Sequence, residues 1–242
     1  MSRSIILLLG TAAYVFFFLT FLYLIAFVGD LPFVPLTVDN GPDAPVGMAL
    51  AIDLLLVALF GVQHSVMARP GFKAMWTKIV PPALERSVYV VAASLMLILL
   101  YIWWLPITAT LWTVEAPAGR IVLWALFGLG WGMVLLSTFL ISHFELFGLT
   151  QVWMNWRQRE IPSKNFVTPF LYKFVRHPLY LGFIIAMWAS PVMTYGHALF
   201  AAAMTAYILI AIRFEERDLT AHLGHEYAEY RQRVGMLTPK LR

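Results

Sequence analysis

The chain contains no cysteine, and this absence excludes several kinds of chemistry. Its 242 residues offer no thiol for a disulfide, for a thiolate nucleophile, for an iron–sulfur cluster or for a cysteine-bound zinc ion. Any catalysis must therefore depend on histidine, tyrosine, arginine or carboxylate side chains.

Charged residues are scarce as well, at 12% of the chain, whereas hydrophobic residues make up 61%. Soluble domains carry about a quarter charged residues and roughly half apolar ones. The composition therefore excludes an ordinary soluble enzyme and predicts an integral membrane protein. The net charge of +4 fits membrane topology better than nucleic-acid binding, so we expect no nucleic-acid partner.

The sequence contains several long apolar runs that could form transmembrane helices. A spanning helix needs about 20 apolar residues, because the hydrocarbon core is roughly 30 Å thick. Four runs have this length, and one further apolar region, 179–214, is about twice as long. Ser190, Pro191 and Gly196 interrupt this region, which favours a helical hairpin over one long helix. The sequence thus predicts an all-α polytopic membrane protein with about six transmembrane helices, including a C-terminal hairpin. The four single spans are Ile5–Val28, which we interpret as a retained helix, Val46–Ala68, Val88–Leu105 and Ile121–Ser142.

The distribution of cations predicts the topology. The loop 29–45 contains three aspartates and no cation, whereas lysine and arginine gather in three other segments. Because cations are retained on the cytoplasmic side, we expect an inner or plasma membrane protein with both termini in the cytoplasm. The cytoplasmic cations are Arg69, Lys73, Lys78, Arg86, Arg157, Arg159, Lys164, Lys173, Arg176, Arg213, Arg217, Arg231, Arg233, Lys240 and Arg242.

Three histidines, His64, His143 and His177, fall at predicted cytoplasmic helix ends. Amphipathic histidines also gather at membrane interfaces without any catalytic role. A metal site is the other alternative, but no paired-histidine spacing occurs, so we expect no metal.

The segment Arg176-His177-Pro178-Leu179-Tyr180 is the most informative local feature. Proline favours the first helical turn, so Pro178 predicts a helix start with Arg176 and His177 beside exposed backbone N–H groups. If the hairpin returns to the same face, Glu215-Glu216 becomes the neighbour of this segment. The cluster could bind an anion at the helix start, or could form an ion pair that pins the two ends of the hairpin together.

These elements resemble the isoprenylcysteine carboxyl methyltransferase superfamily of integral membrane methyltransferases. The resemblance rests on Arg-His-Pro-x-Tyr-x-Gly at 176–182, on Glu215-Glu216, on Gly-x-x-Tyr-x-x-Tyr at 224–230 and on Pro239. It implies that S-adenosylmethionine binds in a cytoplasmic pocket closed by the hairpin and the tail. The residues implied to hold the amino-acid end of this cofactor are Arg176, His177 and Tyr180, those implied to hold its ribose or polar edge are Glu215 or Glu216, and those implied to close the pocket are Tyr227 and Tyr230.

The N-terminal half resembles the branch of this superfamily that contains the methanethiol S-methyltransferases and the NnrU-like proteins. The similar segments begin at Gln63-His64-Ser65, at Glu85-Arg86-Ser87 and at Ser142-His143-Phe144. The resemblance implies one methyltransferase domain over residues 1–242, with 1–143 on the substrate side and 144–242 as the cofactor-binding hairpin and tail. Methyl transfer to a small thiol, from methanethiol to dimethyl sulfide, is the implied reaction. Gly235-Met236 departs from the basic residue common in prenylcysteine enzymes, which argues against a prenylated or anionic substrate.

A thiol is reactive as its thiolate, so the site needs a base or a cationic environment. Our hypothesis is that His64 or His143 accepts the thiol proton. Arg69, Glu85, Arg86 and Tyr89 would orient that base and stabilise charge, and Glu85 and Tyr89 have the spacing of one helical face. A purely structural salt-bridge cluster is the alternative for these four residues.

Other functions stay open at this point. The enzyme could act on another thiol or on a prenylcysteine carboxylate, or could be a membrane reductase or isomerase of the NnrU-like type. A non-catalytic haem or small-molecule carrier is a third class. The sequence leaves the role of Asp53 and the oligomeric state undecided.

Overall fold

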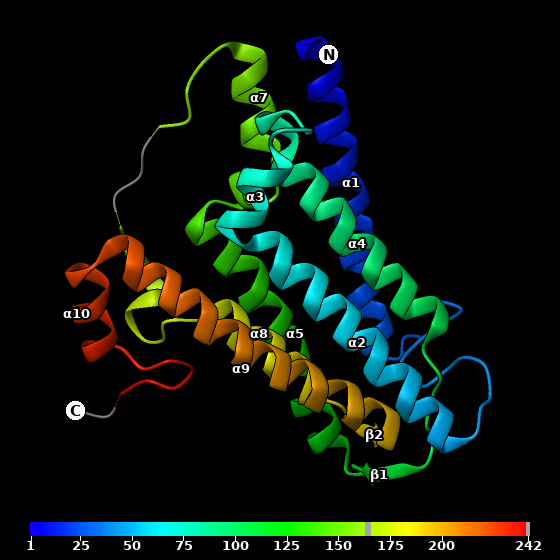
Figure 1. Cartoon of the computed structure of the whole chain (residues 1–242). Coiled ribbons are helices and arrows are strands. Elements are labelled where there is room, and N and C mark those ends of the chain that lie inside the picture. The colour runs from blue at the N-terminus through cyan, green and yellow to red at the C-terminus, as the bar shows by residue number, and fades with distance from the viewer. Residues whose placement is uncertain (163–165, 241–242) are drawn as a thin grey trace. The chain divides into compact units, whose positions relative to one another are not determined.

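A computed structural model describes residues 1–162 and 166–240, and Figure 1 shows that the chain is built from helices. The predicted all-α class is confirmed, with one pair of short strands that the sequence did not predict. Two of the cations used for topology, Lys164 and Arg242, lie outside the described residues. The elements are α1 Arg3–Val28, α2 Val46–Ala68, α3 Pro70–Trp76, η1 Pro82–Leu84, α4 Glu85–Trp103, β1 Thr110–Thr113, α5 Pro117–Ile141, α6 His143–Leu146, α7 Leu149–Arg157, η2 Phe170–Lys173, α8 Pro178–Trp188, β2 Val192–Thr194, α9 Tyr195–Leu223 and α10 His225–Arg233.

Five helical segments among the described residues are long and apolar enough to cross a membrane. They are α1, α2, the segment Pro82–Trp103 that contains α4, α5 and α9. The predicted break in the C-terminal hairpin is present, because α8 ends at Trp188 and α9 begins at Tyr195. However, α8 has 11 residues and is about 16 Å long, half the thickness of the hydrocarbon core. The expectation of six full crossings is therefore not confirmed.

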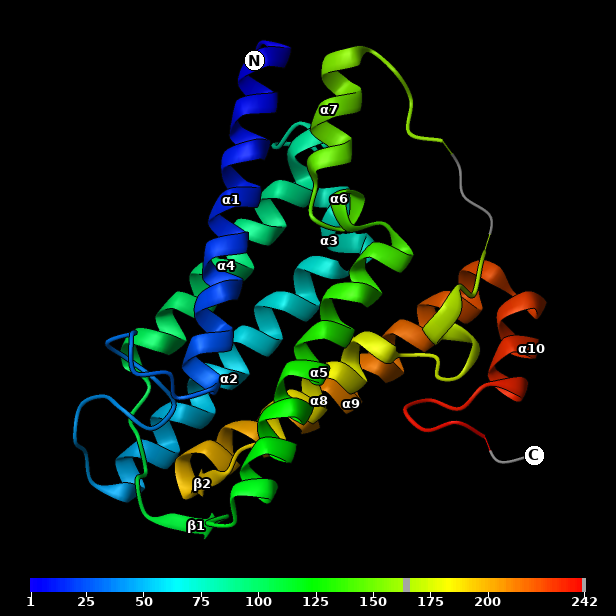
Figure 2. The same cartoon turned by 180° about the vertical axis from the view of Figure 1, so that it is seen from behind.

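The chain folds as two compact units, and the first comprises Met1–Ala109, Ser142–Ser163 and Thr194–Phe200. Within it α1 packs against α4 and α7, and α2 packs against α4 (Figure 2). The apolar cluster of Ile6, Leu84 and Val152 joins α1, η1 and α7. Gly10 allows this approach, because a Cβ at Gly10 would lie 2.5 Å from a Val152 methyl group.

Asp53, whose role the sequence left open, satisfies the backbone where α4 ends. Its side chain is fully buried on α2, and its Oδ1 accepts a hydrogen bond from the backbone N–H of Leu105 at 2.9 Å. A buried backbone N–H without a partner would be costly in an apolar interior. The contact gives Asp53 a structural role.

The second unit comprises Thr110–Ile141, Lys164–Met193 and Ala201–Arg242. Its α5 and α8 lie side by side (Figure 2). Gly130 and Gly182 face each other at the contact. A Cβ at Gly130 would lie 2.7 Å from the carbonyl oxygen of Gly182 and 2.7 Å from the backbone nitrogen of Ala186. Small residues let two membrane helices approach this closely. The position of α8, and with it the start of the Arg-His-Pro segment, depends on these glycines.

We expect Gly130→Ala to destabilise the second unit by about 1–3 kcal/mol, because the added methyl group meets backbone atoms that cannot move independently. Gly132→Ala on the same helix is the matched control, since a Cβ at Gly132 lies within 4 Å of no atom of the described residues outside its own helix backbone and chain neighbours. The midpoint of thermal unfolding in detergent measures the difference. Equal midpoints for the two variants would contradict close packing at Gly130.

Candidate active site

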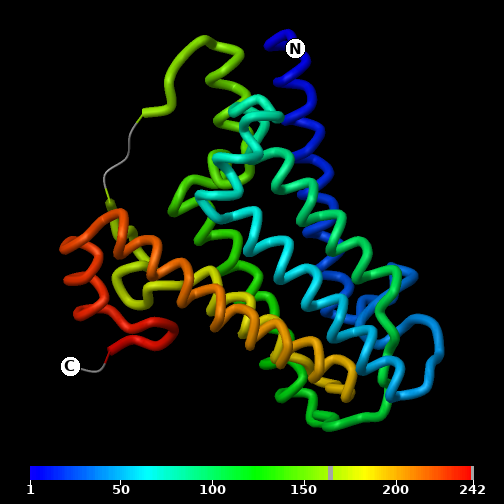
Figure 3. Tube along the Cα trace, in the orientation of Figure 1, coloured from blue at the N-terminus to red at the C-terminus, as the bar shows by residue number. Residues whose placement is uncertain are grey.

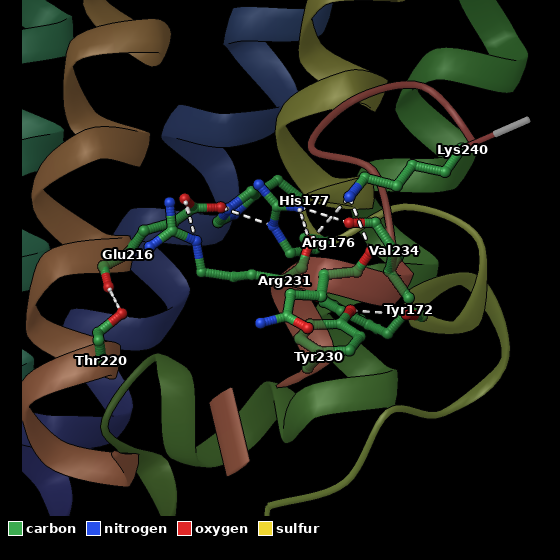
Figure 4. A network of polar contacts seen from close by, with 10 residues as sticks. Tyr172, Arg176, His177, Glu216, Thr220, Tyr230, Arg231, Val234 and Lys240 are labelled. Carbon is green, nitrogen blue, oxygen red and sulfur yellow. Dashed lines mark hydrogen bonds and ion pairs between the residues drawn. The ribbon is translucent and has the colours of Figure 1, made fainter. Parts of the chain in front are cut away.

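Glu216, near the end of α9, is the centre of a network of ion pairs in the second unit (Figure 4). Its Oε1 lies 2.7 Å from Nε of Arg176 and 3.1 Å from Nε2 of His177, and its Oε2 lies 3.2 Å from Nε of Arg231. The side chains of Arg176 and Glu216 are each only 9% exposed, whereas that of Arg231 is 46% exposed. The predicted proximity of Arg176-His177 and Glu216 is confirmed, although Arg176 and Glu216 are 40 positions apart.

The local sequence explains how the helix ends present these groups. Pro178 is in the first turn of α8, as predicted, and His177 is the N-cap residue. The proline ring has no N–H to satisfy and its fixed φ suits a helix start. Arg176 and His177 are therefore held at a helix start, while α9 carries Glu216 to the same place.

The tail that follows α10 is paired to this helix start, and Figure 3 shows its path back from α10. The backbone N–H groups of Arg176 and His177 donate to the carbonyl oxygens of Gly235 at 2.8 Å and Met236 at 3.2 Å. Nη1 of Arg176 also donates to the carbonyl oxygen of Val234. A Cβ at Gly235 would lie 1.8 Å from the carbonyl oxygen of Thr238, so the turn in the tail requires glycine. The departure at Gly235 from the prenylcysteine enzymes thus has a structural reason.

Tyrosines complete the cluster as hydrogen-bond donors. The hydroxyl of Tyr180 donates to Oε2 of Glu215 at 2.8 Å, and that of Tyr230 donates to the backbone carbonyl of Tyr172 at 2.6 Å. Burial raises the pKa of Tyr230 to about 12, and burial with nearby carboxylates raises the pKa of Tyr227 further. These phenols stay protonated near neutral pH. Tyr172 is a member that the sequence interpretation missed.

A cavity of about 540 Å³ opens beside this network. Three cations line it, and ligand pockets commonly have volumes of about 300–1,000 Å³. Arginine and lysine side chains suit the carboxylate or another anionic group of a ligand. Arg231 and Lys240 entered the sequence interpretation only as topology cations, so their place in the cavity was missed. The lining residues are Arg176, Ala228, Arg231, Gln232, Gly235, Met236 and Lys240.

A second candidate site lies in the first unit, around His64 near the end of α2. The hydroxyl of Tyr89 lies 2.8 Å from Nε2 of His64, and Phe60 stacks on the imidazole with ring centroids 5.3 Å apart. The guanidinium carbon of Arg86 lies 5.3 Å from the centre of the Tyr89 ring, a cation–π contact. The structure thus brings together three of the predicted residues, His64, Arg86 and Tyr89.

The other two predicted residues on this side lie at helix ends. Glu85 is the first residue of α4, four positions before Tyr89, as its spacing predicted. Arg69 is the C-cap residue of α2, and its Nε donates to the carbonyl oxygen of Ser65 at 3.2 Å. Their catalytic roles stay predictions.

His143, on the short α6, forms a similar pair with a tyrosine that the sequence interpretation missed. Its Nε2 lies 2.8 Å from the hydroxyl of Tyr14 on α1. The rings of Phe144 and Phe147 lie edge-on to the imidazole at 5.3 and 5.0 Å. Burial lowers the pKa of His143, so the imidazole is neutral near pH 7. The available signal for Tyr14 was a tyrosine near the middle of the first apolar run, a run that also contains the hydroxyls of Thr11, Thr20 and Tyr23.

Comparison with known proteins places the chain in a family. The sequence model of the isoprenylcysteine carboxyl methyltransferase (ICMT) family matches residues 131–221 of this chain. A methanethiol S-methyltransferase from Mycobacterium tuberculosis is 53% identical over 239 residues, which are 99% of this chain and 98% of that protein. A methanethiol S-methyltransferase from a Pseudomonas species is 52% identical over 97% of this chain and 90% of its own length. Nurim from Danio rerio is 27% identical over 79% of this chain and 74% of its own length. No solved structure matches the chain.

We expect Glu216→Gln to destabilise the second unit by about 3 kcal/mol, because it leaves buried Arg176 without its carboxylate. Arg231→Gln should cost less than about 1 kcal/mol, since Arg231 is half exposed. Denaturant unfolding and hydrogen exchange in α10 measure both effects. Glu226→Gln, on an exposed residue of α10, is the control. A loss for Glu216→Gln no larger than for this control would contradict a structural role for the network.

Proposed function

The chain belongs to the methanethiol S-methyltransferase family, and on that premise we propose that it transfers a methyl group from S-adenosylmethionine to methanethiol, forming dimethyl sulfide. The observation that carries the proposal is identity above 50% over nearly the full length of methanethiol S-methyltransferases. The Arg-His-Pro segment, Glu215-Glu216 and the two tyrosines of α10 lie within the unit that contains most of the family match.

The cavity of the second unit suits this cofactor in size and charge. Its volume of about 540 Å³ is that of a small-molecule site, and its cations can bind the amino-acid carboxylate. When bound, S-adenosylmethionine supplies a methyl group on a positively charged sulfonium centre. Glu215 would hold the ribose hydroxyls or the ammonium group, and the buried rings of Tyr227 and Tyr230 would help to close the site.

Arg176 and His177 have a double role in this proposal. Both already contact Glu216, so the network orients their side chains before the ligand arrives. A preorganised guanidinium loses less freedom when it binds a carboxylate. We propose that Arg176 holds the carboxylate of the cofactor with the help of Arg231 and Lys240, and that Tyr180 fixes Glu215.

The thiol side of the reaction is proposed to use the two histidine–tyrosine pairs of the first unit. The thiol proton passes to His64 or His143, directly or through water. The thiolate sulfur then forms a bond to the methyl carbon while the bond from that carbon to the sulfonium sulfur breaks. The bonding electron pair stays on the leaving sulfur. Arg86 and Arg69 supply positive charge that favours the thiolate.

The membrane setting fits a small apolar substrate, which dissolves in the bilayer. We propose that the protein lies in the inner or plasma membrane with both termini in the cytoplasm, because its cations gather in the segments that follow α2, α5 and α9. A reporter fused to each terminus tests this orientation. A periplasmic signal from either terminus would contradict it.

The function is tested by incubating the purified protein with labelled S-adenosylmethionine and a panel of thiols, and by analysing the headspace gas. We expect labelled dimethyl sulfide from methanethiol, and loss of cofactor binding in Arg176→Gln. Binding of S-adenosylhomocysteine, measured by thermal shift, separates the cofactor site from turnover. Nicotinamide nucleotides should give no shift. Methylation of a prenylcysteine carboxylate alone would overturn the proposed substrate, and a nicotinamide-dependent shift would favour the reductase alternative.

The pH dependence tests His143. Its pKa is lowered by burial, so the imidazole loses its base form only as the pH falls below the ordinary histidine value of about 6.5. If His143 accepts the proton, kcat/KM stays high down to pH 6.5 and decreases at lower pH. His143→Ala should reduce kcat/KM and remove that decrease, with cofactor binding unchanged. An unaltered pH profile in this variant would exclude His143 as the base.

A further inference from the structure

His64 differs from His143 in a way that bears on its chemical role. Its Nε2 is engaged by Tyr89, whereas its Nδ1 is buried and has no hydrogen-bond partner among the described residues. Leaving a buried polar atom without a partner is energetically costly. Such an atom is therefore a candidate contact for a bound molecule.

The partner of Nε2 indicates which ring nitrogen carries the proton. A phenol hydroxyl is a stronger donor than an imidazole N–H, and its oxygen is a weak acceptor because a lone pair is delocalised into the ring. The cation of Arg86 over the Tyr89 ring withdraws further electron density from the hydroxyl. Tyr89 is thus expected to donate to Nε2, and the single proton of a neutral imidazole then lies on Nδ1.

Charge around His64 supports the neutral ring. The rings of Phe60 and Tyr89 contact the imidazole of His64, and the hydroxyl of Tyr89 lies 2.8 Å from its Nε2. A positive charge on the imidazole would lie near Arg86 and be repelled by it. The Nδ1–H of His64 is therefore a hydrogen-bond donor held in a fixed orientation by its apolar, aromatic surroundings.

Building on the proposed function, we propose that His64 is not the base of the reaction but a hydrogen-bond donor, whose Nδ1–H contacts the thiolate sulfur. Tyr89 is a positioning residue that fixes this tautomer. The proton of the thiol leaves to His143 or to water before the sulfur attacks. The new hydrogen bond and the positive charge of Arg86 both stabilise the anion, as donors aimed at a developing negative charge do in other enzymes.

The two roles of His64 are separated by amide replacements. The side-chain NH₂ of asparagine can occupy the position of Nδ1–H, whereas that of glutamine reaches the position of Nε2. We expect His64→Asn to keep kcat/KM within about tenfold of the wild type, and His64→Gln and His64→Ala to lose about 100-fold, the loss expected for one such donor. His222→Asn, on an exposed histidine, is the matched control. Equal losses in the asparagine and glutamine variants would overturn the donor role.

A pH profile gives an independent readout. A donor contributes no titrating base, so the acid side of the kcat/KM profile should be the same in His64→Asn as in the wild type. If His64 were the base, that decrease would disappear in the variant. Tyr89→Phe should lower kcat more than it changes KM, because the tautomer is no longer fixed.

The tautomer can be observed without turnover. In protein labelled with ¹⁵N-histidine, His64 should show a protonated Nδ1 and an unprotonated Nε2, and Tyr89→Phe should mix the two tautomers. A protonated Nε2 in the wild type would overturn the proposal. Failure of the wild type to methylate any thiol would instead refute the proposed function, so the two outcomes are distinguishable. Cofactor binding, measured for each variant, identifies variants that lose activity through misfolding.

Discussion

The carboxylate of Glu216 is the group on which the second unit most depends. It is shared by Arg176, His177 and Arg231, which come from the start of α8 and from α10. Without this carboxylate, the guanidinium groups of Arg176 and Arg231 would repel each other beside the positive end of the α8 dipole. One acidic side chain compensates both effects and connects the two ends of the hairpin. The alternative of a structural ion pair is therefore compatible with a ligand site, because the same network lines a cavity that keeps cationic groups available.

In the first unit, the buried polar side chains are held mainly by hydrogen bonds between neutral groups. His64 and His143 are each held by a tyrosine hydroxyl and surrounded by aromatic rings. Inside apolar surroundings an ionised histidine is costly, whereas a neutral imidazole needs only one donor and one acceptor. The two pairs let the protein place polar chemistry in an interior that otherwise resembles lipid. Asp53 is a further buried polar group of this unit, and it accepts a hydrogen bond from the backbone N–H of Leu105 after α4.

Much of the architecture was predictable because the bilayer imposes a single length scale. The boundaries of α2 agree with the predicted run Val46–Ala68, and α1, α4 and α5 differ from their runs by a few residues at the ends. The break near Pro191 and the helix start at Pro178 were predicted from the geometry of proline. The length of α8 was not, because hydropathy continues across 189–194 and does not report where the backbone turns. The strands β1 and β2 were also missed.

The sequence by itself determined that the protein is built for a bilayer, which segments approximately span it and which residue types are available for chemistry. These properties depend on composition and on local backbone preference. It also placed Arg176-His177 and Glu216 together through one short hairpin. Only the tertiary structure decided which atoms meet: that Tyr14 pairs with His143, that Arg231 and Lys240 line a cavity, and that Nδ1 of His64 has no hydrogen-bond partner in the described part of the chain. These contacts join segments far apart in the chain, and their geometry depends on helix packing at glycines such as Gly130 and Gly182. Periodicity and motif spacing carry no information on such distances.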